Sequence, residues 1–229
     1  MIEDPPLLEI ARHVERPAAA LVDRFRNAPT SFIVDAMGGG GALDWRIKPI
    51  GPAAAFVGIA LTCDCGPADN LALAAAVAQC LAGDVLVAAT GSYTGAAVVG
   101  DLLLGIAKNR GAVAFVTDGL VRDTADIEAL GLPCFAAGVT PNSPARNGPG
   151  RVGLPVQCGG LRICSGDIIV GDRDGVVVVP RADIETVLQR LAAVREAEAS
   201  MLAQVKAGLS EVGFVASIPA QRIRHIDGR

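Results

Sequence analysis

The sequence predicts a layered α/β protein, in which βα units are followed by a run of short strands and one long helix. Between residues 55 and 139, short apolar runs rich in β-branched residues alternate with stretches whose apolar residues recur every three or four positions. Between residues 156 and 179, short apolar runs follow one another with only turns between them. Between residues 181 and 208, the apolar positions form one helical stripe. Such alternation is typical of an α/β architecture.

Composition narrows the class of protein. The chain has 229 residues, of which 51% are hydrophobic, so we expect a single domain over residues 1–229. A net charge of −4 and a single Trp and Tyr argue against nucleic-acid binding. No apolar run is long enough to cross a bilayer, and the acidic start M-I-E-D-P-P does not resemble a secretory leader, so we expect a cytoplasmic protein without membrane contact. The six scattered cysteines predict free thiols.

Residues 1–45 form a mainly helical N-terminal part in this interpretation. Two helical stretches are expected between residues 5 and 27, with Pro17 at the start of the second. Thr30 is expected to cap a third helix that ends at the four glycines of residues 38–41. These glycines either approach a ligand closely or form a turn, which is their commoner use.

The βα units follow. Strands are expected at residues 46–50, 55–62 and 85–89, with a helix between the last two that Asp69 caps. The glycine-rich loop at residues 90–95 lacks both common nucleotide-binding patterns. Because a loop before a helix presents backbone N–H groups, we expect it to be an anion-facing wall of a cleft.

The stretch from Gly100 to Asp123 has charged residues at both ends. A helix is expected at residues 101–110, with Asp101 in its first turn, and a buried strand at residues 112–117. Gly100-Asp101 and Arg122-Asp123 then lie at a helix start and after a strand, where α/β proteins place ligand groups. Taken alone, the spacing also fits a structural interpretation, in which Arg122 and Asp123 form an ion pair and Asp101 is a helix-terminal charge.

A helix at residues 124–130 and a strand at residues 134–139 come next, followed by a loop at residues 140–153. Arg146 or Arg151 in this loop either reaches a second substrate carboxylate or is a solvated charge, which is the commoner role.

The spacing of the charged ends resembles that of the RraA-like proteins. Their pattern is Asp, twenty residues, Arg-Asp, which appears here as Asp101 and Arg122-Asp123. The similarity continues through A-G-D-V-L-V at residues 82–87 and G-D-I-I-V-G-D-R-D-G-V-V-V-V-P at residues 166–180. The resemblance implies a swivelling β/β/α domain, an α-β-β-α layered sandwich with N-terminal helices and a long C-terminal helix.

The resemblance also implies an activity. The family includes divalent-metal-dependent aldolases that cleave 4-hydroxy-4-methyl-2-oxoglutarate and 4-carboxy-4-hydroxy-2-oxoadipate to pyruvate and a second oxo acid. Oxaloacetate decarboxylation is a related expectation, because it passes through the same pyruvate enolate. The alternative is a non-catalytic regulator that binds a ribonuclease, since such family members keep the Arg-Asp motif.

Roles for the residues follow from this chemistry. Arg122 would bind the substrate carboxylate bidentately and lie beside the enolate oxygen. Asp123 would hold Mg²⁺ or Mn²⁺, and the scarcity of histidines, of which the chain has only two, argues against zinc. Asp101 would orient a water as proton shuttle. Gly100 and the backbone N–H groups of Leu102 and Leu103 would face the substrate from the helix start.

The helix expected at residues 181–208 is interpreted as an oligomer contact. The family's aldolases bring a C-terminal glutamate into a neighbour's site, and Glu198 lies inside the apolar stripe, whereas Glu196 points away from it. We therefore expect Glu198 to act in the site of a neighbouring subunit of a homotrimer or homohexamer.

Overall fold

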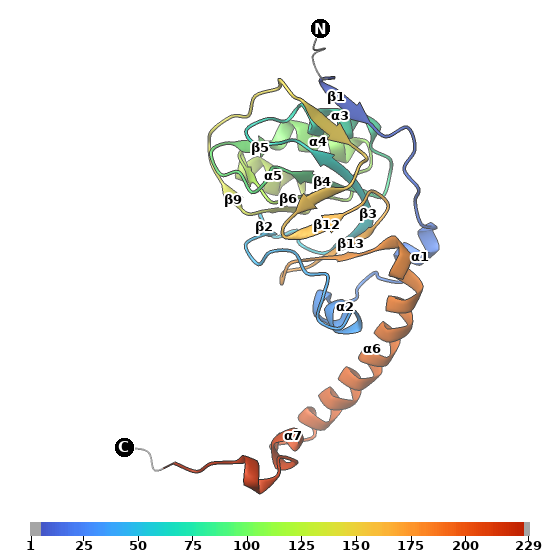
Figure 1. Ribbon diagram of the computed structural model, residues 1–229, viewed down its shortest axis with the longest axis vertical. Coiled ribbons are helices and arrows are strands. Elements are labelled where there is room, and N and C mark those ends of the chain that lie inside the picture. The colour runs from blue at the N-terminus through green and yellow to red at the C-terminus, as the bar shows by residue number, and fades with distance from the viewer. Residues whose placement is uncertain (1–5, 227–229) are drawn as a thin grey trace. The chain divides into compact units, whose positions relative to one another are not determined.

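A nine-stranded sheet is the centre of the first of two units into which the chain divides, residues 1–191 and 192–229. The computed structural model describes residues 6–226. Helices α3, α4 and α5 connect neighbouring parallel strands of this sheet in chain order, which confirms the predicted α/β fold (Figure 1). The bounds are β3 (Phe56–Asp64), α3 (Leu71–Gln79), β4 (Asp84–Ala89), α4 (Asp101–Asn109), β6 (Ala114–Thr117), α5 (Thr124–Leu130) and β8 (Cys134–Ala136).

Antiparallel strands complete this sheet. On the free edge of β3, β13 (Ile168–Gly171) pairs with its first half and β10 (Gly150–Val152) with its last residues. The remaining pairs are β14 (Val176–Val179) with β13 and β2 (Lys48–Pro49) with β8. A separate hairpin consists of β11 (Val156–Cys158) and β12 (Leu161–Ile163). The predicted β-rich segment after residue 153 is therefore present.

Two segments differ from the sequence prediction. The first helical stretch expected after residue 5 is wrong, because β1 (Leu8–Ile10) is a strand that pairs in parallel with β10. The loop expected at residues 140–153 likewise ends in β10. Both strands are only three residues long, and their pairing joins segments about 140 residues apart in sequence, so local periodicity does not indicate either of them.

A second, three-stranded parallel sheet consists of β5 (Ala97–Val99), β7 (Leu120–Val121) and β9 (Gly138–Val139). Each of these strands follows a parallel strand of the large sheet, and the first two lead into a helix, which gives the repeated order strand, strand, helix. The twenty residues between Asp101 and Arg122 span α4, β6 and β7. The sequence spacing of the motif is therefore the length of one structural repeat.

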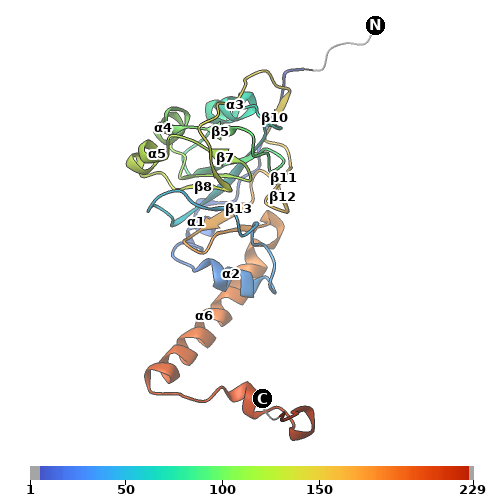
Figure 2. The same ribbon diagram turned by 90° about the vertical axis from the view of Figure 1, so that its left-hand side faces the viewer.

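The large sheet is buried on both faces. On β4, Leu86 and Ala88 pack in a cluster with α3, α4 and α5, whereas Val85 and Val87 pack in a second cluster with β11, β12 and β14. Figure 2 shows the three helices on one side of the sheet and the β11–β12 hairpin on the other. Period-two alternation on a strand explains this division, and burial on both faces explains why β4 is apolar throughout.

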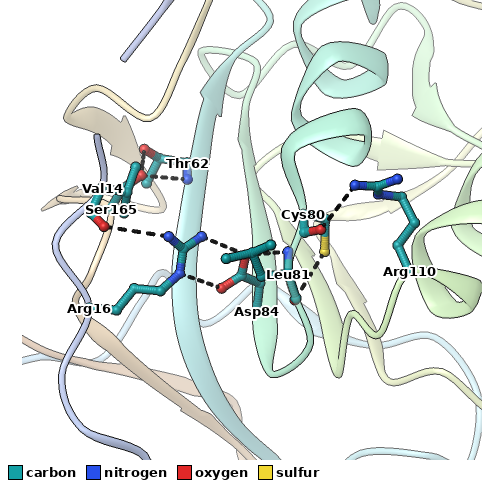
Figure 3. Close-up of polar contacts among 8 residues, drawn as sticks. All are labelled: Val14, Arg16, Thr62, Cys80, Leu81, Asp84, Arg110 and Ser165. Carbon is teal, nitrogen blue, oxygen red and sulfur yellow. Dashed lines mark hydrogen bonds and ion pairs between the residues drawn. The ribbon is translucent and has the colours of Figure 1, made fainter. Parts of the chain in front are cut away.

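An ion pair fastens the N-terminal segment to this sheet. The guanidinium of Arg16 donates to both oxygens of Asp84, at 3.2 and 2.9 Å, and Leu81 N–H donates to the same carboxylate (Figure 3). Asp84 is only 1% exposed. A buried carboxylate needs such partners, because an unpaired one is costly.

Helices α1 (Ala19–Asp23) and α2 (Thr30–Ala36) confirm the remaining N-terminal helices. Thr30 differs in its role, because Pro29 is the N-cap and the Thr30 hydroxyl and N–H instead donate to Asp172, each at 2.8 Å. The six cysteines are free, as predicted, and burial raises the pKa of the Cys134 thiol to about 12.

The predicted C-terminal helix is α6 (Ile184–Lys206), which begins in the first unit with buried Ile184, Val187 and Leu188. In the second unit its apolar residues are about half exposed, among them Met201, Leu202 and Val205. Residues 192–226 also contain α7 (Gly213–Ala216) and a short 3₁₀ helix at Ala220–Arg222. None of the helices in residues 6–226 is both long and apolar enough to cross a membrane. A single domain over residues 1–229 and an oligomer contact at residues 181–208 stay predictions.

Candidate active site

The carboxyl ends of β5, β7 and β9 lie at one edge of the three-stranded sheet, because the three strands are parallel. Gly100-Asp101 follows β5, Arg122-Asp123 follows β7, and the loop that contains Ser143 follows β9. Backbone bonds hold these ends in order: Arg122 N–H donates to Val99 C=O at 3.1 Å, and Thr140 N–H donates to Val121 C=O at 3.0 Å. Strand ends of this kind are a common position for ligand groups.

Helix α4 begins at this edge. Gly100 is its N-cap, in extended conformation, and Asp101 lies in its first turn, as predicted. The first N–H groups of a helix have no partner within the helix, and the helix dipole favours negative charge there. The N–H groups of Leu102 and Leu103 are therefore donors available for an anionic ligand.

The Arg122-Asp123 pair lies beside this helix start. The Nε of Arg122 is 3.1 Å from Oδ2 of Asp123, both side chains are about one third exposed, and Arg122 Nη1 also donates to Ser143 Oγ. Asp123 has a left-handed backbone, with φ of 58°, which is uncommon for a residue other than glycine. Backbone strain of this kind often occurs at functional sites. Its Oδ1 makes no hydrogen bond within the described residues and is free for a ligand.

Gly100 makes room for this pair. A Cβ atom at Gly100 would lie 2.3 Å from Asp123 Oδ2, far inside contact distance, and 3.1 Å from Arg122 Nε, which is a tight contact. The backbone of Gly100 has φ of −126°, which any residue can adopt, so the requirement for glycine is one of space. Any side chain here would displace the carboxylate or the guanidinium.

These groups line a cavity of about 380 Å³. All six residues predicted in the first unit line it together: Gly100, Asp101, Leu102, Leu103, Arg122 and Asp123. Asn70, Ser143 and Arg146 also line it. Sequence reasoning treated Asp69 before α3 as a helix cap and did not select Asn70 or Ser143, because an Asn before a helix and a Ser in a proline-rich loop are both common without function.

Two other predicted groups lie elsewhere. Arg151 pairs with Asp64 across β10 and β3 and does not line this cavity. Glu198 is an exposed residue of α6 in the second unit, residues 192–229, and its role stays a prediction.

The loop at residues 90–95 is not a wall of this cavity, so that expectation is wrong. Its polar groups are satisfied from within by Asp118, which is 5% exposed. Oδ1 of Asp118 accepts from the N–H and hydroxyl of Thr90, at 2.7 and 3.0 Å, and Oδ2 accepts from Ser92 N–H at 2.9 Å. The N–H groups of Thr90 and Ser92 therefore already bind an anion, which is a side chain of the protein.

The ligand groups of the cavity fit a metal ion held by few protein side chains. Within residues 6–226, no three His, Cys, Asp or Glu side chains form a cluster that could hold a metal. Asp101 and Asp123 supply two carboxylates to the cavity wall. Mg²⁺ is held in many proteins by one or two carboxylates and keeps several waters, and Mn²⁺ prefers the same oxygen ligands. The residues present therefore fit Mg²⁺ or Mn²⁺ and do not supply a zinc centre.

Comparison with known proteins identifies a family profile, a relative by sequence and similar solved structures. A family profile described as RraA-like, Aldolase/RraA, matches residues 30–178. A Halalkalibacterium halodurans protein, provisionally named 4-hydroxy-4-methyl-2-oxoglutarate aldolase, is 40% identical over 169 residues, or 74% of this chain and 80% of that protein. The structure of an uncharacterized Pseudomonas syringae protein has a TM-score of 0.75 and 27% identity over 86% of this chain and 96% of its own. That of the RNA-processing inhibitor RraA from Thermus thermophilus has a TM-score of 0.62 and 28% identity over 67% and 93%.

Proposed function

The chain belongs to the RraA-like family, and from this premise we propose that it is a divalent-metal-dependent aldolase. Its substrate would be a 4-hydroxy-2-oxo acid with two or three carboxylates, cleaved to pyruvate and a second oxo acid. The observation that supports this proposal is the single cavity into which Arg122, Asp123, Asp101 and the start of α4 all open. The name of the relative from H. halodurans agrees with a carbon–carbon lyase of this kind.

Arg122 would bind the carboxylate at the 2-oxo end. Its planar guanidinium can donate two parallel hydrogen bonds to a carboxylate, which a lysine cannot do. Ser143 and Asp123 fix the guanidinium from two directions, so little side-chain freedom is lost when substrate binds. The N–H groups of Leu102 and Leu103 would stabilise negative charge that develops on the substrate.

Asp123 would hold a Mg²⁺ or Mn²⁺ ion, which when bound would supply a Lewis acid next to the 2-oxo group. Asp101 would accept a hydrogen bond from a water and so direct that water to receive the proton of the 4-hydroxyl. Because oxaloacetate decarboxylation passes through the same pyruvate enolate, the same residues would support it as a side activity.

The competing function is that of a non-catalytic regulator of a ribonuclease. It is favoured by the likeness to the RNA-processing inhibitor from T. thermophilus. The cavity that gathers carboxylate and guanidinium groups favours the enzyme.

The test is a screen of 4-hydroxy-2-oxo acids and oxaloacetate with Mg²⁺ or Mn²⁺, with pyruvate release as the readout. We expect release that requires the metal and stops when a chelator is added. Absence of release from every compound, together with inhibition of RNA cleavage by a ribonuclease, would favour the regulator.

We further propose that the protein assembles as a homotrimer or homohexamer in which Glu198 completes the site of a neighbouring subunit. This proposal rests on the exposed apolar residues of α6, which a partner surface would cover. Mixing two inactive variants, Glu198→Ala and Asp123→Ala, should restore part of the activity. A fully active monomer, or no recovery after subunit exchange has been confirmed, would contradict it.

A further inference from the structure

Asn70 has a buried polar atom without a partner, and it lies in the cavity wall. Within residues 6–226, its Oδ1 is the one buried side-chain oxygen or nitrogen that lacks a hydrogen bond. The residue is 5% exposed and lines the same cavity as Arg122. A buried acceptor that has lost its water and gained no protein donor is unfavourable, so such an atom points to a ligand that supplies the donor.

Arg146 provides a second cation in this cavity. Its side chain is exposed and makes no ion pair within the described residues, whereas Arg122 is already paired with Asp123. The cavity therefore contains two guanidinium groups, each with the planar donors that suit a carboxylate. If Arg122 binds the carboxylate at the 2-oxo end, Arg146 remains available for a second carboxylate.

Asp69 holds Asn70 and Arg146 next to each other. One oxygen of its carboxylate accepts from Leu71 N–H at 2.8 Å, and the other accepts from the N–H groups of Asn147 and Gly148. Asp69 is 9% exposed, so water competes little for these bonds.

Backbone bonds join the same two segments. Asn70 N–H donates to Ala145 C=O at 3.0 Å, and Ala145 N–H donates to Ala68 C=O at 2.7 Å. The loop after β9 is therefore fixed against the start of α3, which places Arg146 beside Asn70 before any ligand binds.

We propose that Asn70 and Arg146 form a second subsite, which binds the part of the substrate that leaves as the second oxo acid. This inference rests on the proposed aldolase function. Arg146 would bind the distal carboxylate, and Asn70 Oδ1 would accept a hydrogen bond from the 4-hydroxyl of the newly bound substrate. The hydroxyl would then turn from Asn70 to the water held by Asp101, which receives its proton. The apolar side chains of Leu102, Ile106 and Pro144 line the same cavity and would contact the carbon chain.

The first experiment measures binding without turnover. Isothermal titration compares pyruvate, which has one carboxylate, with 2-oxoglutarate, which has two. Arg146→Met should weaken 2-oxoglutarate binding about tenfold to a hundredfold and change pyruvate binding less than twofold. Arg162→Met is the matched control, because it removes an exposed arginine from β12, on the other face of the large sheet, and should change neither. Equal effects of Arg146→Met on both ligands, or failure of the parent protein to bind 2-oxoglutarate, would overturn the subsite.

The second experiment concerns Asn70. Asn70→Ala should lower kcat/KM for 4-hydroxy-2-oxoglutarate about tenfold to a hundredfold, because the 4-hydroxyl of this substrate loses Asn70 Oδ1 as its acceptor. Binding of 2-oxoglutarate, which has no 4-hydroxyl, should change less than threefold in the same variant. A loss of similar size for both compounds would show that Asn70 only supports the loop, and would contradict its assigned role.

The two proposals fail in different ways. A parent protein that releases no pyruvate but still distinguishes 2-oxoglutarate from pyruvate through Arg146 would contradict the aldolase and leave the subsite in place. Pyruvate release that is insensitive to both substitutions would contradict the subsite and leave the aldolase in place.

Discussion

Two consecutive repeats of the fold, β4–β5–α4 and β6–β7–α5, share one architecture but contribute differently to the cavity. In each, a strand of the large sheet is followed by a strand of the small sheet and then by a helix. The first repeat supplies Gly100, which lacks a side chain, and the free N–H groups of α4. The second supplies Arg122 and Asp123, whose side chains occupy the space that Gly100 leaves. Besides the Asp101 carboxylate, the first repeat thus contributes the space at Gly100, and the second contributes the Arg122-Asp123 pair that occupies this space.

The same comparison separates two aspartates of the second repeat. Asp118 directly follows β6, is 5% exposed, and has both oxygens occupied by donors of the loop at residues 90–95. Asp123 lies two residues after β7, has a side chain that is 37% exposed, and has one oxygen free of hydrogen bonds within the described residues. A carboxylate whose acceptor capacity is used by its own chain is structural, whereas one with capacity left can bind a ligand.

The largest effect is expected for Asp123. Asp123→Ala should reduce metal-stimulated pyruvate release about a thousandfold, because a site with few carboxylates loses an anchoring one. Asp123→Asn is the matched variant, since Asn tolerates the left-handed backbone and keeps the shape of the side chain. Both variants should retain the far-UV circular dichroism of the parent. Full activity with unchanged metal affinity in either variant would contradict the assignment.

Asp118 should show the opposite pattern. Asp118→Ala leaves the buried N–H and hydroxyl of Thr90 without an acceptor and should lower the free energy of unfolding by about 3 kcal/mol. Urea denaturation measures this loss. The variant should keep most of its kcat/KM at temperatures where it is folded, because residues 90–95 do not line the cavity. A stable variant with abolished activity would place Asp118 in the chemistry and remove the distinction between the two aspartates.

Arg122→Lys tests whether geometry or charge matters in the second repeat. We expect a loss of about a hundredfold in kcat/KM, close to that of Arg122→Ala, because an ammonium cannot donate two parallel bonds to a carboxylate. Steady-state kinetics of pyruvate release measure both. If the lysine variant were as active as the parent, a bidentate role for Arg122 would be wrong.

The smallest effect is expected from adding a side chain at Gly100, in the first repeat. Gly100→Ala should lower kcat/KM about tenfold, because the added Cβ would push the Asp123 carboxylate or the Arg122 guanidinium slightly out of position. Gly105→Ala, in the same helix, is the control: its Cβ would lie 3.7 Å from Leu130 Cδ2, an ordinary contact, and should stabilise α4 slightly. Comparable activity of the two variants would contradict the role given to Gly100.

The sequence predicted the parts of this site that are local. Asp101 and Arg122-Asp123 were selected because their spacing resembles that of the RraA-like proteins, and because the sequence pattern places them at a helix start and after a strand. Asn70 was not recognisable, because its importance depends on the loop after β9, which reaches it only in the folded chain. The loop at residues 90–95 was misinterpreted for the same reason, since its N–H groups bind Asp118, 26 to 28 residues away. Long-range hydrogen bonds of side chains leave no periodic pattern in a sequence.

The hydrogen bonds by which Asp69 holds the loop after β9 have a consequence for how such a protein can change over evolution. The residues proposed to bind the distal end of the substrate lie on α3 and on this loop, whereas those proposed for bond cleavage lie on the two repeats between them. The loop is joined to the start of α3 mainly through backbone groups and one carboxylate. The side chains of residues 144–147 can therefore be exchanged while the loop keeps its path. A new substrate preference would then require substitutions in one short surface segment, without any change to the residues that act on the bond.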